Sequence, residues 1–454
     1  MPLPRAREHT YTGRSTTAGR TAVSSGGASI GVGGSSPVSS QGGRGGTVAS
    51  AFGGSKEPGA GGAAISGGDT GAGEAGAPTT PPPDPPPLFS KAALLEAVAE
   101  CSVAEIQGFL AQAELLVDKA RAHAAAPSDA GARQAARDAF LVAMDSFQVL
   151  EVFRFGPAAR VADDPAGKDL RDQMYAWPLG GRCNIETQIV SEGYSSATFS
   201  TSLINLRGMG ALEFLLFYEG NDNTCPDYSP INVQGTWLAL GEAGLRQRKA
   251  LYAQAVAENV LENARELSRA WQASGGDYRQ QLIGAGVGQS QLYATTQAAL
   301  NAVSNALFYV EVEDKDLKLG VPLALSPDCL AASCPEALES RYARSSARNI
   351  ANNLRGFQRL FWGCGATGST SLGFDDWLRA VAADNLESRM SSAFQGAAVA
   401  IDGIDRPLED LLLSEPTRVR GLYDAIKVLT DLLKSEFVSV LELELPKSTE
   451  GDND

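Results

Sequence analysis

Residues 207–217 read Arg-Gly-Met-Gly-Ala-Leu-Glu-Phe-Leu-Leu-Phe and predict a short, strongly apolar helix that two glycines open. This helix carries a single carboxylate, Glu213. A carboxylate that moves from water into an apolar interior loses hydration energy unless a cation or a hydrogen-bond donor compensates it. The sequence therefore predicts a buried Glu213 that needs a partner.

Longer amphipathic helices are predicted on the N-terminal side of this stretch. Ser90 can cap a helix over about 91–125, which Pro127 ends. In the next helix large apolar residues recur every three or four positions, at Phe140, Met144, Phe147, Leu150 and Phe153. This spacing places them on one face of a helix that should pack against others.

The rest of the chain is also predicted to be helical. Short helices are expected near 169–176, 184–193 and 208–217, and longer ones over about 242–274, 278–315, 336–362 and from Leu422 to Val440. Gly284, Gly286 and Gly288 should kink or interrupt the second of the long ones. No run alternates cleanly enough for a strand. The pattern predicts an all-α fold of two tandem helical bundles, with approximate halves 89–240 and 241–446.

Residues 1–88 differ in composition from the rest of the chain. They are rich in Gly, Ser, Ala, Thr and Pro and carry almost no large apolar side chains. Such a segment cannot bury enough surface to offset its conformational entropy, so we expect a disordered tether that ends in a stiff polyproline stretch. Residues 89–446 form the predicted helical domain, and 447–454 form an acidic tail.

The chain is acidic: 38 lysine and arginine residues stand against 53 aspartate and glutamate residues, a formal net charge of −15. The tether holds six basic and five acidic residues, +1, so the remainder carries −16. This charge argues against nucleic acid and anionic membrane surfaces as partners. No apolar run is long enough to predict a transmembrane segment.

The N-terminal composition bears on location. No stretch near Met1 has the apolar core of a secretory signal, so this start encodes no visible export signal. A Gly, Ser and Pro tether ahead of a helical domain is nevertheless common in envelope proteins, where it spaces a domain from its anchor. A start codon assigned in the wrong place would explain the missing signal. We therefore hypothesise a protein of the periplasm or outer membrane that associates with the envelope through its tether.

Six cysteines occur. Cys329 and Cys334 lie in a loop-like stretch between prolines, close enough in sequence for a local disulfide. The other four lack zinc-site spacing, and there is no CxxC. An even number of cysteines, several of them in loops, favours an oxidising compartment. The alternative is six buried free thiols.

Histidine is scarce, with only His9 in the tether and His123 near the end of the first long helix. We interpret His123 as a solvated residue at a helix end. A Ser-His-Asp or Cys-His arrangement would then lack its base. A zinc hydrolase would need ligands almost entirely from carboxylates, which suit zinc poorly.

Carboxylates are the remaining chemical resource. If folding brings Glu151, Asp172 and Glu186 to Glu213, their oxygens could hold a hard cation such as calcium, or iron. The alternative is that each carboxylate pairs with an arginine that is near in sequence, the choices being Arg154, Arg171, Arg182 and Arg207.

The stretch around Glu213 resembles the signature of the imelysin family, also called the M75 peptidase-like family, which reads G-x-H-x-x-E. Gly208 and Glu213 match the first and last positions, and Gly210 stands where the family has its histidine. Further blocks resemble the family, at 153–157, 174–178, 205–217, 317–323 and 345–356. Together they extend over about 90–440.

The resemblance implies two helical bundles, residence in the periplasm or on the outer membrane, and a link with iron uptake. It also implies a metallopeptidase site whose metal ligands are the histidine and glutamate of the motif. Here Gly210 removes one ligand. Glu213 either remains as a ligand for a divalent metal or iron, or pairs with Arg207. Arg207, Gly208, Gly210 and Trp177 then belong to the motif and its pocket.

We predict from these observations an envelope protein that binds a cation, a metal complex or a small ligand in a helical cleft around Glu213. It would assist uptake and lack peptidase activity. One alternative is a metal-dependent peptidase with an altered, carboxylate-rich site. Another is a structural scaffold of the envelope.

Overall fold

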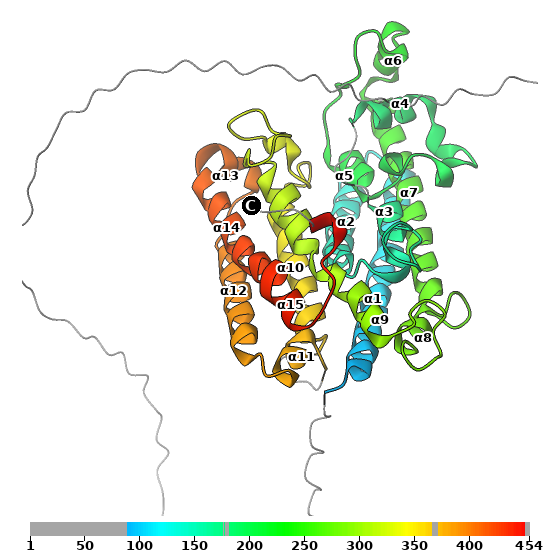
Figure 1. Ribbon diagram of the computed structural model, residues 1–454. Helices are drawn as coiled ribbons and strands as arrows, with labels where there is room; N and C mark the ends of the chain where they lie inside the picture. The colour runs from blue at the N-terminus through cyan, green and yellow to red at the C-terminus, as the bar shows by residue number, and fades with distance from the viewer. Residues whose placement is uncertain (1–88, 176, 178–180, 366–370, 450–454) are drawn as a thin grey trace, which may run out of the picture. The chain divides into compact units, whose positions relative to one another are not determined.

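The computed structural model describes residues 89–175, 177, 181–365 and 371–449 (Figure 1). All of them belong to one compact unit, Pro82–Asp454. The predicted tether over 1–88 and the end of the predicted acidic tail lie outside the described residues. Within the described residues every regular element is a helix, so the all-α prediction is confirmed.

The first part of this unit is built on three long helices, α1 (Lys91–Ala125), α2 (Ala130–Glu151) and α7 (Thr236–Trp271). The side chain of Ser90 caps α1 as predicted, and that of Asp129 caps α2. Between α2 and α7 lie the short helices α3 (Leu170–Met174), α4 (Cys183–Ser191), α5 (Met209–Phe217) and α6 (Pro230–Val233), with the 3₁₀ turns η1 (Gly156–Ala158), η2 (Gly193–Ser195), η3 (Phe199–Thr201) and η4 (Ile204–Leu206).

The second part contains more elements than the sequence predicts. They are α8 (Tyr278–Ile283), α9 (Thr296–Leu307), the π-helix η5 (Val310–Gly320), η6 (Pro335–Ala337), α10 (Ser346–Trp362), α11 (Phe374–Ala380), α12 (Asp384–Asp402), α13 (Leu408–Ser414), α14 (Pro416–Leu432), the π-helix η7 (Leu433–Phe437), α15 (Val438–Val440) and η8 (Lys447–Thr449). The helix predicted over 278–315 is interrupted, because Gly286 and Gly288 have positive φ angles. The helix predicted over 336–362 begins only at Ser346.

The helices pack in two groups that α10 connects. In the first group α1 packs against α2 and α7, and α5 packs against α7 and α2. In the second group α14 packs against α12, α13 and η5. Helix α10 contacts both α2 and η5, and Figure 1 shows it between the two groups. The division at about residue 240 stays a prediction; α7, which begins near that point, packs mainly on helices that precede it.

All six cysteines are paired in disulfides. Cys329 joins Cys334 within the loop after η5. The sequence analysis assigned no partners to the other four, which pair as Cys183–Cys225 and Cys101–Cys364. None of the described helices combines the length and the apolar composition that a membrane span requires.

Candidate functional site

Glu213 lies in the middle of α5 and is 2% exposed. Its Oε1 accepts hydrogen bonds from the backbone N–H groups of Tyr342 and Ala343, at 2.8 and 3.0 Å. Its Oε2 accepts one from the hydroxyl of Ser340, at 2.9 Å. Glu213 therefore fixes residues 340–343, the loop before α10, onto α5.

Burial raises the pKa of Glu213 to about 7, against the three hydrogen bonds, which lower it. The nearby carboxylate of Glu339 raises it further. A group with this pKa exchanges its proton near neutral pH, unlike an exposed glutamate.

Arg207 does not pair with Glu213, so the arginine alternative is wrong for this carboxylate, whereas Glu151 and Asp172 pair with Arg171 and Glu186 pairs with Arg182. The Arg207 guanidinium donates to the backbone oxygen of Ser202 at 2.8 Å and to the side chains of Asn259 and Gln173. These partners are neutral, and burial lowers the pKa of Arg207. Arg207 thus fixes the segment that precedes α5 and does not form an ion pair with Glu213.

The two motif glycines lie at the start of α5. Gly208 is the N-cap residue, and a Cβ atom there would lie 2.9 Å from the backbone oxygen of Met174. Gly210 is buried in the first turn and offers no ligand atom. The first position of the motif therefore serves close backbone packing, whereas the third has no side chain to face Glu213.

A cavity of about 240 Å³ lies beside Glu213. The aromatic residues Trp177, Phe214 and Tyr342 line it, together with Arg182 and Glu339. A wider hollow of about 440 Å³ adjoins it, and both are lined by Gly181, Arg182, Arg341 and Tyr342. Of the residues predicted from the sequence, this cavity gathers Glu213 and Trp177.

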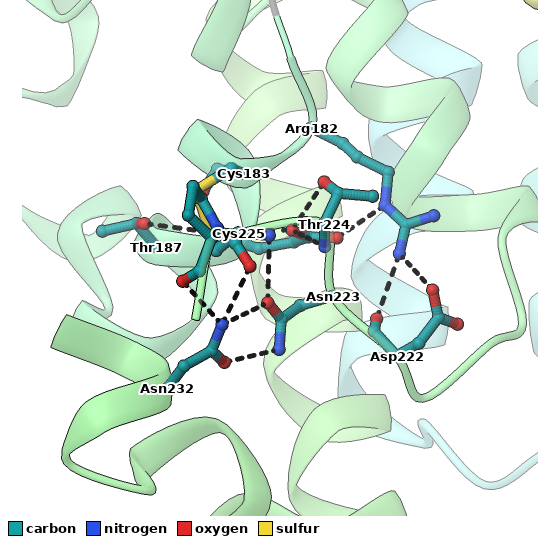
Figure 2. Close-up of a disulfide and its surroundings, with 10 residues drawn as sticks. Arg182, Cys183, Thr187, Asp222, Asn223, Thr224, Cys225 and Asn232 are labelled. Carbon is teal, nitrogen blue, oxygen red and sulfur yellow. Dashed lines mark hydrogen bonds and ion pairs between the residues drawn. A yellow bond between two sulfur atoms is a disulfide. The ribbon is translucent and has the colours of Figure 1, made fainter. Parts of the chain in front are cut away.

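Glu186 does not line this cavity but holds Arg182, which does. Its Oε1 accepts from Arg182 Nε at 2.5 Å, and its Oε2 accepts from the backbone N–H of Thr224 at 2.8 Å. The disulfide Cys183–Cys225 fastens the same two segments together, and Figure 2 shows Arg182 extended from it toward Asp222. The Arg182 guanidinium lies over the ring of Tyr218, 4.1 Å from its centroid. Glu186 and the disulfide therefore position Arg182.

Glu151 and Asp172 lie together elsewhere in the core. Arg171, 4% exposed, forms an ion pair with Glu151 and another with Asp172, and Asp172 also pairs with Arg160 at 2.9 Å. Burial raises the pKa of Glu151 despite this pair. Burial also acts to raise the pKa of Asp172, but Arg171 and Arg160 outweigh it and lower the pKa.

A buried polar cluster, which the sequence analysis missed, includes the cavity residue Glu339 and acts electrostatically on Glu151. Glu339 accepts from Tyr175, Asn349 and Gln148 at 2.9 to 3.0 Å. Lys318, 1% exposed, forms an ion pair with Glu339 at 3.0 Å. The sequence feature that could have predicted this cluster is Lys318, a lysine between two leucines in a block that resembles the family.

The four carboxylates predicted as metal ligands do not gather into a common ligand set. Within the described ranges the one group of three ligand atoms close enough for a metal is Cys101, Glu105 and Cys364, and both of its sulfurs belong to a disulfide. Both oxygens of Glu213 are already hydrogen-bonded. The described residues thus do not fit a metal held directly by the protein at Glu213.

Comparisons with known proteins agree on the fold. A family model described as Imelysin matches residues 102–435. A candidate iron-regulated protein A precursor from Parabacteroides distasonis ATCC 8503 is 18% identical, with a TM-score of 0.59 over 78% of this chain and 95% of that one. An imelysin-like protein from Psychrobacter arcticum 273-4 is 15% identical, with a TM-score of 0.52 over 78% and 98%. No curated protein matches the chain.

Proposed function

The chain belongs to the imelysin family, and from this premise we propose that it is a binding or uptake-accessory protein of the cell envelope, without peptidase activity. Its ligand is a small organic molecule or a metal complex held in the cavity beside Glu213. The main support for this proposal is that both carboxylate oxygens of Glu213 already accept hydrogen bonds, from three donors in the 340–343 loop. The motif thus shapes a cavity, and no histidine of the described residues lines it.

The cavity walls suit a ligand with a flat apolar face. Phe214 and Tyr342 meet edge to face with ring centroids 5.3 Å apart, and Trp177 lies on the same cavity. Arg182 and Arg341 add hydrogen-bond donors at its rim. A metal complex whose own atoms satisfy the metal would use these contacts without a protein ligand.

The link with iron is also a proposal. It rests on the name of one similar structure, an iron-regulated protein, and on family membership. The envelope location is supported by three disulfides, a number typical of proteins in oxidising compartments.

Thermal unfolding of the full chain, alone and with Fe(II), Fe(III), Zn(II), Ca(II) or haem, tests the proposal. A ligand that binds the folded state raises the melting temperature. We expect haem to do so. The rise should be lost in Tyr342→Ala and retained in Tyr228→Ala, which removes an exposed ring outside the cavity. No shift with any of these ligands would contradict the metal and metal-complex form of the proposal and leave a small organic ligand or a scaffold role. Cleavage of casein that a chelator abolishes would favour the peptidase alternative.

A further inference from the structure

A second cavity, of about 280 Å³, lies between the end of α1, the first half of α2, the end of α5 and the first half of α7. It shares no lining residue with the cavity beside Glu213. Basic side chains line it from two helices, Arg133 and Arg137 from α2 and Arg246 and Lys249 from α7.

The charge of this cavity is opposite to that of the domain around it. Four cations face two carboxylates, Glu219 and Glu242, which leaves +2 in a region whose overall charge is −16. Glu219 is 60% exposed and pairs with Arg137 at 2.7 Å and with Arg133 at 3.8 Å. Glu242 pairs with Arg246 at 3.2 Å. Both carboxylates are thus committed to arginines.

Lys249 is the cation that remains. It is 8% exposed, and its Nζ donates to the backbone oxygens of Tyr218 and Gly220 at 3.0 and 3.1 Å. An ammonium group has three N–H donors, and the third makes no hydrogen bond to the described residues. The rings of Phe214 and Tyr218 lie near it, with centroids 5.4 and 5.1 Å from Nζ. No carboxylate of the described chain lies within ion-pair distance of Lys249. Burial lowers its pKa to about 8 and Arg182 lowers it further, against the opposing effect of the carboxylates of Glu186, Asp222 and Glu219.

His123 is an independent sign of a ligand. It was expected to be solvated, but it is 4% exposed because the end of α1 packs under α2 and α7. Its Nδ1 is buried and has no hydrogen-bond partner among the described residues, and the side chain lines the cavity. Buried polar atoms usually have a hydrogen-bond partner, and a water or a ligand in the cavity could supply the one that this nitrogen lacks.

We propose that this cavity is a binding site for a small oxyanion, a phosphate or a carboxylate. Lys249 supplies charge and His123 a hydrogen bond, and Arg133 adds charge because Glu219 lies 3.8 Å from it and is held more closely by Arg137. The volume of about 280 Å³ is slightly below the roughly 300 Å³ at which small-molecule pockets begin, which favours a compact ligand. Oxyanions match ammonium and guanidinium donors in geometry as well as in charge.

The two histidines make a direct test possible. With histidine labelled by ¹⁵N, the full chain gives signals from His123 and from His9, which lies outside the described residues and serves as an internal reference. Addition of sodium phosphate or sodium citrate at constant pH and ionic strength should shift the His123 signals in a saturable way and leave those of His9 in place. Preference between the two salts identifies the class of anion.

Variants complete the test. Lys249→Gln keeps a donor for the two backbone oxygens and removes the charge. The affinity for the anion should fall roughly tenfold or more. Lys119→Gln removes the same charge from the exposed side of α1 and should bind like the unchanged protein. Equal movement of both histidines, no shift beyond that caused by sodium chloride, or unchanged affinity in a folded Lys249→Gln protein would overturn the proposal.

Discussion

Glu213 links residue chemistry to the stability of the whole chain. Its pKa in the folded state is raised to about 7 from 4.5, so the folded state prefers the protonated form more than the unfolded chain does. The corresponding stability is fully present below pH 4.5 and is lost as the pH rises to about 7. A shift of this size corresponds to about 3 kcal/mol.

Glu213→Gln should remove this dependence, because the amide keeps an acceptor for the backbone N–H groups and does not titrate. Urea unfolding of both proteins at pH 4.5 and pH 8 measures it. The variant should be about as stable as the unchanged protein at pH 4.5 and should exceed it by up to about 3 kcal/mol at pH 8, where the unchanged protein carries a buried charge. Comparing the two proteins cancels other titrating groups, such as Asp375, whose pKa burial raises to about 6. A difference that is the same at both pH values would show that Glu213 ionises normally.

The buried pair of Glu151 and Arg171 supports a second prediction. Arg171→Met leaves the Glu151 carboxylate without its cation and should lower the free energy of unfolding by about 3–5 kcal/mol. Adding Glu151→Leu removes the stranded charge and should recover much of this loss. Arg420→Met is the matched control, since it breaks an exposed pair with Asp424 and should cost about 0.5 kcal/mol or less. Equal losses in the two single variants would contradict the assigned role.

The sequence predicted that Glu213 is buried and has a partner, but it did not identify that partner. An apolar helix around Glu213 implies burial and therefore a partner. The partner is a set of backbone N–H groups and Ser340, more than a hundred residues further along the chain. Backbone donors leave no mark on composition, and the nearby Arg207 offered a local alternative that the fold does not use.

Gly356 determines how closely two elements approach. A Cβ atom there would lie 2.5 Å from the backbone oxygen of Val149 and 2.8 Å from Val152 Cγ2, so α10 touches the end of α2 at this point. Gly356→Ala should destabilise the protein by about 1–3 kcal/mol because the helices must separate. Gly396→Ala, on α12, meets no atom within 4 Å and should stabilise by up to about 1 kcal/mol. Thermal unfolding of the two variants checks the pair; a neutral Gly356→Ala would mean that the helices part easily.

Helices were predicted best where apolar spacing was regular and caps were present. Helix α1 begins and ends within a residue of its prediction for this reason. Helix α12 was missed although Leu386, Met390, Ala397 and Ile401 are buried along one side, because small residues between them dilute the pattern. Residues 338–345 were predicted as helix, but their N–H groups are used at Glu213 and Arg344 has a positive φ of 56°.

Over the whole molecule, the disulfides differ in the length of chain that they close. Cys101–Cys364 closes 263 residues and Cys329–Cys334 closes five. Because a crosslink restricts the unfolded chain more when its loop is longer, Cys101→Ala with Cys364→Ala should cost about 5 kcal/mol, against about 2 kcal/mol for Cys329→Ala with Cys334→Ala. Urea unfolding of both double variants measures the difference, and the reverse order would show that the local disulfide constrains the native loop itself.

The fold class and the family were within reach of the sequence, because helical spacing and motif blocks are local. The pairing of distant cysteines was not, since nothing local connects Cys101 to Cys364. The same holds for the second cavity. In the sequence His123 is an ordinary helix-end residue. Only the packing of α7 against α1 places it in the same cavity as Lys249.

The nested order of the disulfides has a consequence for biosynthesis. Cys183 and Cys225 pair inside the long loop that Cys101 and Cys364 close. An oxidase that joined cysteines in the order in which they leave the ribosome or a translocon would connect Cys101 to Cys183, and that bond is foreign to the fold. Maturation therefore requires either that Cys101 stays reduced until Cys364 arrives or that an isomerase corrects the early bond. Yield in a host should accordingly depend on isomerase supply more than on oxidising strength.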